Sequence, residues 1–332
     1  NVAVLGATGA VGETILEVLQ ERKFPVGEIF LLASERSEGK TCRFNGKTVL
    51  VQNVEEFDWS QVHIALFSAG GELSAKWAPI AADEGVIVID NTSHFRYEYD
   101  IPLVVPEVNP EAIAEFRNRN IIANPNCSTI QMLVALKPIH DAVGIERINV
   151  STYQSVSGAG KAGIDELAGQ TAKLLNGVPA DKKQFSQQIA FNCIPQIDQM
   201  MENGYTKEEM KMVWETQKIF NDPSITVNPT CVRVPVFYGH AEAVHVETSS
   251  PIDAQEVVNL LEQTDGIEVF HGDNFPTQVR DSGGKDHVMV GRIRNDISHH
   301  SGVNLWVVAD NVRKGAATNA VQIAEILIRD YY

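Results

Sequence analysis

The chain has 332 residues, of which 44% are hydrophobic and 21% are charged, as in an ordinary globular protein. This length predicts two domains, each large enough to bury a core of its own. With 27 lysines and arginines against 43 aspartates and glutamates the net charge is −16, which argues against nonspecific binding to nucleic acid or an anionic membrane. If the ligand is itself an anion, the few cations must be gathered around it.

Cysteine usage points to a reducing compartment. Cys42, Cys127, Cys193 and Cys231 are far apart and form no C-x-x-C pair. We therefore expect neither a disulfide framework nor a bound metal. No apolar run approaches the length of a membrane span, and we expect no signal peptide, so a cytoplasmic enzyme is predicted.

A glycine-rich turn lies near the start of the chain. Residues 2–5 (VAVL) predict a strand buried on both faces, and a helical pattern runs from about Ile15 to Leu19. Between them, residues 6–12 (GATGAVG) form a G-x-x-G-x-x-G variant of the dinucleotide-binding turn. In such a turn the glycines let the backbone approach a pyrophosphate, whose charge lies at the helix N-terminus. This setting favours a nucleotide site.

The residues after the second predicted strand, 28–33, bear on the choice of nucleotide. A carboxylate near this position usually binds the ribose 2′-hydroxyl of NAD, whereas an arginine accommodates the 2′-phosphate of NADP. Arg36 with Ser37, and Lys40 nearby, favours NADP, while Glu35 leaves use of NAD open. The alternative is a solvated charged loop.

Strands and helices alternate through the first 126 residues, which predicts a doubly wound domain. Further strands are predicted at 63–67, 86–90, 103–105 and 121–123, with an alanine-rich helix at about 72–84. Ligands bind beyond the carboxyl ends of such strands, so the connecting loops are expected to line the cofactor site. Arg96 lies in an otherwise uncharged loop and is either a gathered cation or a merely solvated side chain.

Cys127 lies at the corner between the strand at 121–123 and an amphipathic run that begins at Ile130. The unpaired N–H groups and the positive dipole at a helix N-terminus favour thiolate over thiol. Cys127 is thus a candidate nucleophile. The alternative is a small half-buried residue at a turn.

After this helix the pattern changes to period-two alternation over 147–156, which indicates a half-exposed sheet. A glycine-rich segment at 157–160 either passes close to a ligand or forms a plain turn. The remaining sequence predicts a mixed or antiparallel sheet, with a hinge at 310–311 before a last helix that packs back on the first domain. Helices are predicted at 161–175, 207–220 and 315–328, a loop at 178–188, and strands at 267–270, 288–293 and 303–308.

Arg233 lies inside an apolar strand, where an unpaired cation is costly, so an anionic partner is implied. His240 follows seven residues later and would lie on the opposite face of one continuous strand. A bend near Pro235 or Gly239 is therefore required if both line one pocket. His245 is a competing base, but its place in an alternating run favours a sheet role.

The chain resembles bacterial aspartate-β-semialdehyde dehydrogenase over essentially its whole length. The resemblance implies an α/β fold: a Rossmann-like doubly wound NADP-binding domain of residues 1–126 and 312–332, and an α+β catalytic and dimerisation domain of residues 127–311 with a mixed sheet. The family is typically a homodimer with this second sheet in the interface. The matching motifs are 6–12, 124–129 (NPNCST), 153–160 (YQSVSGAG), 214–218 (WETQK) and 233–240 (RVPVFYGH).

The resemblance also implies a reaction, the reversible NADPH-dependent reduction of 4-aspartyl phosphate to aspartate 4-semialdehyde and phosphate. This step serves the synthesis of lysine, diaminopimelate, threonine and methionine. In this family pattern Cys127 is the nucleophile, His240 the acid/base and Gln154 the residue that orients the intermediate. Arg233 would hold the substrate α-carboxylate and Glu215 the α-ammonium.

The same pattern makes Arg96 and Lys218 ligands of the phosphate, although on spacing alone Glu215 and Lys218 read as a surface ion pair. Asn126 would contact the substrate, and its corner with Cys127 can supply an N–H to an oxyanion. The residues expected to contact the cofactor are Gly6, Thr8, Gly9, Ala10, Val11, Gly12, Ser34, Arg36, Ser37, Ala69, Gly70, Ser157, Gly158 and Asn311.

Two alternatives stay open on the sequence. N-acetyl-glutamyl-phosphate reductase shares the architecture and the cysteine–histidine chemistry, but its acetylated substrate has no use for a carboxylate such as Glu215. A non-catalytic nucleotide-binding protein could keep the fold without the chemistry. Against it stands the joint occurrence of Cys127, Gln154, Arg233 and His240.

Overall fold

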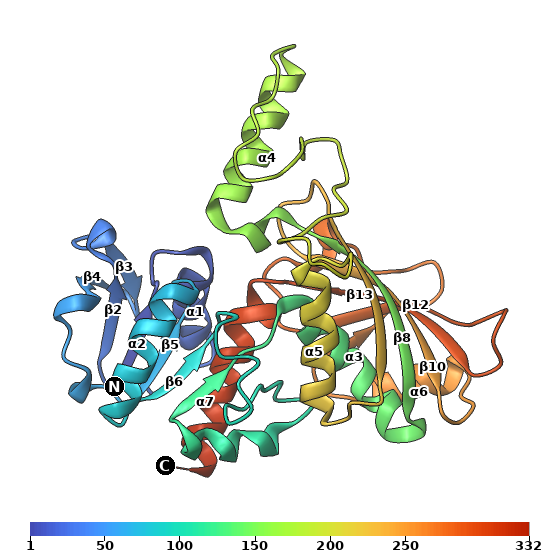
Figure 1. Cartoon of the computed structure of the whole chain (residues 1–332), viewed down its shortest axis with the longest axis horizontal. Coiled ribbons are helices and arrows are strands. Elements are labelled where there is room, and N and C mark those ends of the chain that lie inside the picture. The colour runs from blue at the N-terminus through green and yellow to red at the C-terminus, as the bar shows by residue number, and fades with distance from the viewer. Residues whose placement is uncertain (332) are drawn as a thin grey trace. The chain divides into compact units, whose positions relative to one another are not determined.

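The computed structural model describes residues 1–331 and divides into two compact units. Unit 1 comprises Asn1–Asn126 and Ala316–Tyr332, and unit 2 comprises Cys127–Gly315. Each unit is built around a sheet of its own (Figure 1). Within the described residues, no helix is long and apolar enough to cross a membrane.

Unit 1 contains a seven-stranded sheet in the order β3-β4-β2-β1-β5-β6-β7. All neighbouring strands pair in parallel except β3 with β4, so the doubly wound prediction is confirmed. The strands are β1 (Val2–Leu5), β2 (Ile29–Ala33), β3 (Thr41–Phe44), β4 (Lys47–Asn53), β5 (Ile64–Phe67), β6 (Ile87–Asp90) and β7 (Ile121–Ala123).

Two details of this sheet differ from the sequence-based prediction. The β3–β4 hairpin was not predicted, because it lies at the edge of the sheet and many of its side chains are polar and exposed. The strand predicted at 103–105 is wrong: it forms only a single bridge, between Leu103 and Ala123. The Asn109 side chain instead binds the N–H of Val105 and the carbonyl of Leu103, both at 2.9 Å, and so satisfies backbone groups that a strand would pair.

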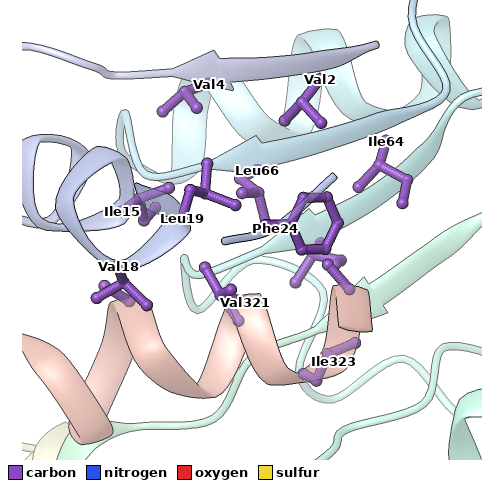
Figure 2. Packing of buried hydrophobic residues seen from close by; sticks show 14 of the residues in the cluster. Val2, Val4, Ile15, Val18, Leu19, Phe24, Ile64, Leu66, Val321 and Ile323 are labelled. Atoms are coloured by element: carbon purple, nitrogen blue, oxygen red, sulfur yellow. The ribbon is translucent and has the colours of Figure 1, made fainter. Parts of the chain in front are cut away.

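The helices of unit 1 are α1 (Ala10–Glu21), α2 (Gly71–Asp83) and α7 (Thr318–Asp330). Figure 2 shows how α1 and α7 pack on the sheet: Ile15 and Leu19 of α1 lie near Leu66 of β5, and Val18 faces Val321 of α7. The last helix therefore shares the core of unit 1, because its apolar stripe completes the layer that α1 begins.

Unit 2 contains a six-stranded mixed sheet in the order β11-β12-β13-β10-β8-β9. The outer pairs β11–β12 and β8–β9 are parallel and the pairs between them are antiparallel, as the mixed-sheet prediction requires. The strands are β8 (Ile145–Gln154), β9 (Thr226–Arg233), β10 (His240–Thr248), β11 (Ile267–Val269), β12 (Val288–Asn295) and β13 (Gly302–Ala309).

Helices cover one face of this sheet. They are α3 (Cys127–Val143), α5 (Lys207–Phe220) and α6 (Ala254–Glu262), and α3 contacts both of the others. A fourth helix, α4 (Gly160–Leu175), extends away from the sheet (Figure 1) and packs through Leu167 on Ile189 and Ile194. Among residues 1–331 the opposite face of the sheet is only partly covered: Asn149 and Tyr153 are partly exposed, whereas Ala241 and Met289 are buried where Phe270 packs on this face.

Candidate functional site

The glycine turn of unit 1 has the close packing that a dinucleotide-binding turn needs. Gly6 has φ +90° and directly follows β1. The turn that it begins leads into α1. A Cβ on Gly12 would lie 2.1 Å from the carbonyl oxygen of Gly6, so only glycine fits there. Gly9 is the N-cap of α1 and provides no side-chain cap, which leaves the first N–H groups of the helix to an anion.

The other expected cofactor residues of unit 1 follow the neighbouring strands β2 and β5. Ser34 caps a short 3₁₀ turn, Glu35–Ser37, in which Glu35 and Arg36 are both exposed. The Ser37 hydroxyl accepts a hydrogen bond from Lys40 at 3.2 Å. Because β2 and β5 flank β1 in parallel, these residues and Ala69–Gly70 lie at the same carboxyl edge as the glycine turn.

Arg96 is buried, with 6% of its surface exposed, so the solvated-loop alternative is wrong. Its guanidinium donates to the carbonyl of Asn124 at 2.9 Å and to that of Asn91 at 3.0 Å. These bonds fix the cation at the carboxyl ends of β6 and β7, where unit 1 is expected to bind its ligand.

In unit 2 the sheet register aligns three candidate residues in one row. Gln154 at the end of β8 is the direct partner of Arg233 at the end of β9 and of His240 at the start of β10. Arg233 and His240 therefore belong to two strands that flank a third one. The connection between them includes Gly239 at φ +87°, which is the bend that the sequence required.

His240 is fully buried and its ring is held from behind. Nδ1 accepts a hydrogen bond from the backbone N–H of Ser155 at 3.1 Å, and the Ser155 hydroxyl lies 3.2 Å from the same atom. Burial and the nearby charge of Arg233 lower the pKa of His240 to about 3. The ring is therefore neutral, and because Nδ1 accepts, its proton lies on Nε2.

The carboxamide of Gln154 is bound at both ends. Its Oε1 accepts from the Thr152 hydroxyl at 2.9 Å, and its Nε2 donates to Oε1 of Glu208 at 3.1 Å. Glu208 was not among the residues expected from the sequence. One signal could have found it: Glu208 precedes Glu215 by seven residues on α5, about two turns, so both project from the same face.

Arg233 is 6% exposed, and its guanidinium donates to the carbonyl of Ser155 at 2.7 Å. Burial lowers the pKa of Arg233, although Glu208 and Cys127 act in the opposite direction. Among residues 1–331, no carboxylate forms an ion pair with Arg233. A buried cation without an ion-pair partner among the described residues implies an anionic ligand.

Cys127 is the first residue of α3 and is partly exposed. Its side chain is close enough to Arg233 for its negative charge to raise the pKa of that residue. Gly315 makes room for it, since a Cβ there would lie 2.9 Å from the Cβ of Cys127. The helix N-terminus and the arginine both favour a thiolate at this position.

Asn311 connects the segments that carry the row. Its Oδ1 accepts from the N–H of Gly239 at 2.9 Å and from the hydroxyls of Ser155 and Ser157 at 3.1 Å. The side chain of Asn311 and the hydroxyl of Ser157 thus have partners inside unit 2, and their contact with a cofactor stays a prediction. A Cβ on Gly158 would lie 2.9 Å from Nη1 of Arg233, so this glycine, too, belongs to the site.

The remaining candidates lie on both units. Glu215 is fully buried on α5, which excludes the surface ion pair that the spacing alone suggested, and Lys218 on the next turn is partly buried. Asn126 of unit 1 is also buried. His245 lies within β10, where its Nε2 is 2.7 Å from Asp296, and so has the sheet role expected for it.

Comparison with known proteins agrees with this description. Residues 1–116 match the model of the semialdehyde dehydrogenase NAD binding domain, and residues 136–314 match that of the semialdehyde dehydrogenase dimerisation domain. Together with the doubly wound unit and the cysteine–histidine site, these matches define the class as that of the semialdehyde dehydrogenases.

Individual relatives narrow the class further. The chain is 88% identical to aspartate-semialdehyde dehydrogenase 2 of Vibrio cholerae over 100% of this chain and 98% of that protein. The crystal structure of the V. cholerae enzyme II complexed with ASA superimposes with a TM-score of 1.00, at 88% identity and with 100% and 99% of the two chains covered. That of the Candida albicans enzyme with NADP gives 0.78 at 25% identity, with 98% of each chain covered. The chain belongs to the aspartate-semialdehyde dehydrogenase family.

Proposed function

We propose that the enzyme reduces 4-aspartyl phosphate reversibly to aspartate 4-semialdehyde and phosphate, through an acyl-thioester on Cys127. The observation that carries this proposal is the row of Arg233, Gln154 and His240 on three adjacent strands of the unit whose helix α3 begins at Cys127. The row combines a cation for a carboxylate, an amide and an imidazole, which are the groups that acyl transfer to a thiol requires.

In the first half of the reaction the Cys127 thiolate attacks the acyl carbon. A C–S bond forms, the bond from carbon to the phosphate oxygen breaks, and phosphate leaves. The helix N-terminus and Arg233 stabilise the thiolate before attack. N–H groups at the start of α3 are suited to bind the oxyanion that develops on the acyl oxygen.

In the second half NADPH, when bound, supplies the hydride that reduces the thioester carbon. The C–S bond of the tetrahedral adduct then breaks, and the sulfur leaves as thiolate because a thiolate is a weaker base than an alkoxide. His240, with its proton on Nε2, is set to donate a hydrogen bond to the adduct oxygen or to the departing sulfur. As a base toward the thiol proton it would need its own proton on Nδ1 instead, a tautomer that the N–H of Ser155 opposes.

Substrate recognition is assigned to the cations and carboxylates of the site. Arg233, buried and without an ion-pair partner among residues 1–331, is proposed to bind the α-carboxylate in bidentate fashion. Glu215, a buried carboxylate, is proposed to bind the α-ammonium, and Arg96 and Lys218 the phosphate. These few cations account for anion binding by a chain of net charge −16.

The residues of unit 1 fit NADP. The close packing of Gly12 against the backbone of Gly6 and the uncapped N-terminus of α1 are the features of a turn that binds a pyrophosphate. The exposed Arg36 at the end of β2 suits a 2′-phosphate, with Glu35 beside it leaving room for NAD. The other contacts proposed in unit 1 are Gly6, Thr8, Gly9, Ala10, Val11, Ser34, Ser37, Ala69 and Gly70, and those proposed in unit 2 are Ser157, Gly158 and Asn311.

The assembly proposed is a homodimer formed by the face of the unit 2 sheet that the helices do not cover. Tyr153 and Trp306 contact each other on neighbouring parts of this face and are only partly buried. Such a face is normally covered by another layer. Because the reaction consumes NADPH and serves amino-acid biosynthesis, we place the enzyme in the cytoplasm.

The test is an assay of the wild-type enzyme and of Cys127→Ser in the direction of phosphate-dependent aldehyde oxidation. Cys127→Ser should lose at least about 10³-fold in turnover, because the thioester cannot form, while NADP binding is largely kept. Unchanged turnover would refute the nucleophile assignment. Preference of the wild type for the N-acetyl-glutamyl acyl phosphate over the aspartyl one would refute the substrate assignment.

A further inference from the structure

The carboxamide of Gln154 has one orientation imposed on it. Amide nitrogen can only donate a hydrogen bond and a carboxylate can only accept one. Because Glu208 accepts at one end, and the Thr152 hydroxyl can donate at the other, the amide nitrogen must face Glu208. The flipped orientation would bring the oxygens of Gln154 and Glu208 together inside a buried site, where two acceptors without a donor between them are destabilising.

Glu208 is itself fixed from outside the row. Its Oε2 accepts from Nζ of Lys211 at 2.9 Å, and the same ammonium binds Asp198 at 2.9 Å. Burial lowers the pKa of Lys211, but the two carboxylates outweigh it and raise that pKa to about 12. Lys211 is therefore charged throughout the physiological range and holds Glu208 as a carboxylate.

The same amide nitrogen lies 3.5 Å from Nε2 of His240. That imidazole nitrogen carries the proton of the neutral ring, because Nδ1 accepts from the backbone of Ser155. Two donors cannot bond to each other, so both are available to a third atom between them. An oxygen atom that gains negative charge is the acceptor such a pair suits.

We propose that Glu208 is a positioning residue, which fixes the carboxamide of Gln154 so that its NH₂ group, together with Nε2–H of His240, binds the acyl oxygen of the substrate. This inference rests on the proposed function of the site. Glu208 touches neither the substrate nor the sulfur in this scheme: it acts through Gln154. Thr152 supports it from the other end of the amide.

The decisive variant is Glu208→Gln. Lys211 can only donate, so it binds the oxygen of the new amide at position 208. The NH₂ group of that amide then faces Nε2 of Gln154. Two donors then oppose each other, so the carboxamide of Gln154 flips. Its oxygen now faces residue 208 and takes the place near His240 that its NH₂ group held. We expect kcat for aspartate semialdehyde to fall about 10–100-fold with KM changed less than about threefold, as for loss of one oxyanion donor.

A double-mutant cycle separates positioning from a merely structural role. In a Gln154→Ala background, Glu208→Gln should change kcat less than about twofold, because the group through which Glu208 acts is gone. The matched control is Glu209→Gln. Glu209 is the neighbouring buried carboxylate, but it caps α5 and accepts from the N–H of Cys231, so its replacement should lower stability and leave kcat within about twofold.

Equal losses of kcat from Glu208→Gln in both backgrounds would overturn the inference, as would no loss in the wild-type background. If Glu208→Gln does not fold, Thr152→Val serves the same cycle, since it removes the donor at the other end of the amide. A wild-type enzyme that turns over no aspartate semialdehyde would instead overturn the proposed function, and with it the premise of the cycle.

Discussion

The backbone N–H of Ser155 donates to Nδ1 of His240 at 3.1 Å, on the adjoining strand of the sheet. Because a backbone amide cannot lose its proton, this bond disfavours the imidazolium form, in which Nδ1 would also carry a proton. The same contact therefore determines the tautomer of the ring, while burial and the nearby charge of Arg233 lower its pKa.

This pKa predicts an acid-sensitive stability. Between the usual value of 6.5 and about 3, the unfolded chain takes up a proton at His240 that the folded chain does not. The free energy of unfolding therefore falls as pH drops through this window, by about 1.4 kcal/mol per pKa unit. Urea unfolding of the wild type and of His240→Asn at pH 7 and 4.5 measures it: the variant should lose less stability than the wild type between the two pH values. An equal loss would contradict the prediction.

Glu242 predicts a pH dependence of the opposite sign. Both of its carboxyl oxygens are buried on β10 and lack a hydrogen-bond partner among residues 1–331, and burial raises its pKa well above 4.5. The folded chain thus keeps a proton that the unfolded chain releases above that pH, so stability declines as pH rises through the interval between the two pKa values.

Replacement of this carboxyl should remove that decline. We expect Glu242→Gln to lose less unfolding free energy between pH 5 and pH 8 than the wild type, by about 1.4 kcal/mol for each unit by which the folded pKa is raised within that range. Glu247→Gln on the same strand is the control, since Glu247 is partly exposed and its replacement should leave the slope unchanged. If the unfolding free energy changes equally with pH in the wild type and in Glu242→Gln, the carboxyl of Glu242 is ionised in the folded chain and the prediction is wrong.

Gly158 predicts a steric effect on substrate binding. A Cβ at this position would lie 2.9 Å from Nη1 of Arg233 and 3.4 Å from Nε2 of His240. Gly158→Ala should push the guanidinium away and raise KM for aspartate semialdehyde about tenfold or more, because a bidentate contact tolerates little displacement. Gly169→Ala on α4 is the control. Its new methyl group meets no atom within 4 Å, so steady-state kinetics should be unchanged and stability slightly higher.

The fold was largely predictable because its strands and helices have clear periodicities. The apolar run at β1 and the alternation along β8 gave the correct sheet types, and α5 has the predicted bounds. The edge hairpin β3–β4 was missed because exposed polar strands carry little pattern, and the segment at 103–105 was misassigned because an apolar run does not reveal a side chain that satisfies its backbone.

The site was less predictable than the fold. Because Arg233 and His240 are seven positions apart, the sequence predicted opposite faces of one continuous strand. Nothing local indicated that Gln154 would lie between them. Glu208 was missed because it stands beside Glu209, and the sequence does not distinguish a cap from a carboxylate aimed at the site. Such distinctions depend on sheet register and helix phase, which are tertiary properties.

The parallel pairing of β8 with β9 makes the row of Gln154 and Arg233 a long-range contact in the chain. Two parallel neighbours need a crossover, and here it contains α4 and α5. The loop-closure entropy of that crossover must be overcome before the two side chains meet, which slows folding of this part relative to the short-range pair β12–β13. An early intermediate can therefore contain the helix that begins at Cys127 without the arginine beside it. Catalytic competence then reports that this crossover of unit 2 has closed.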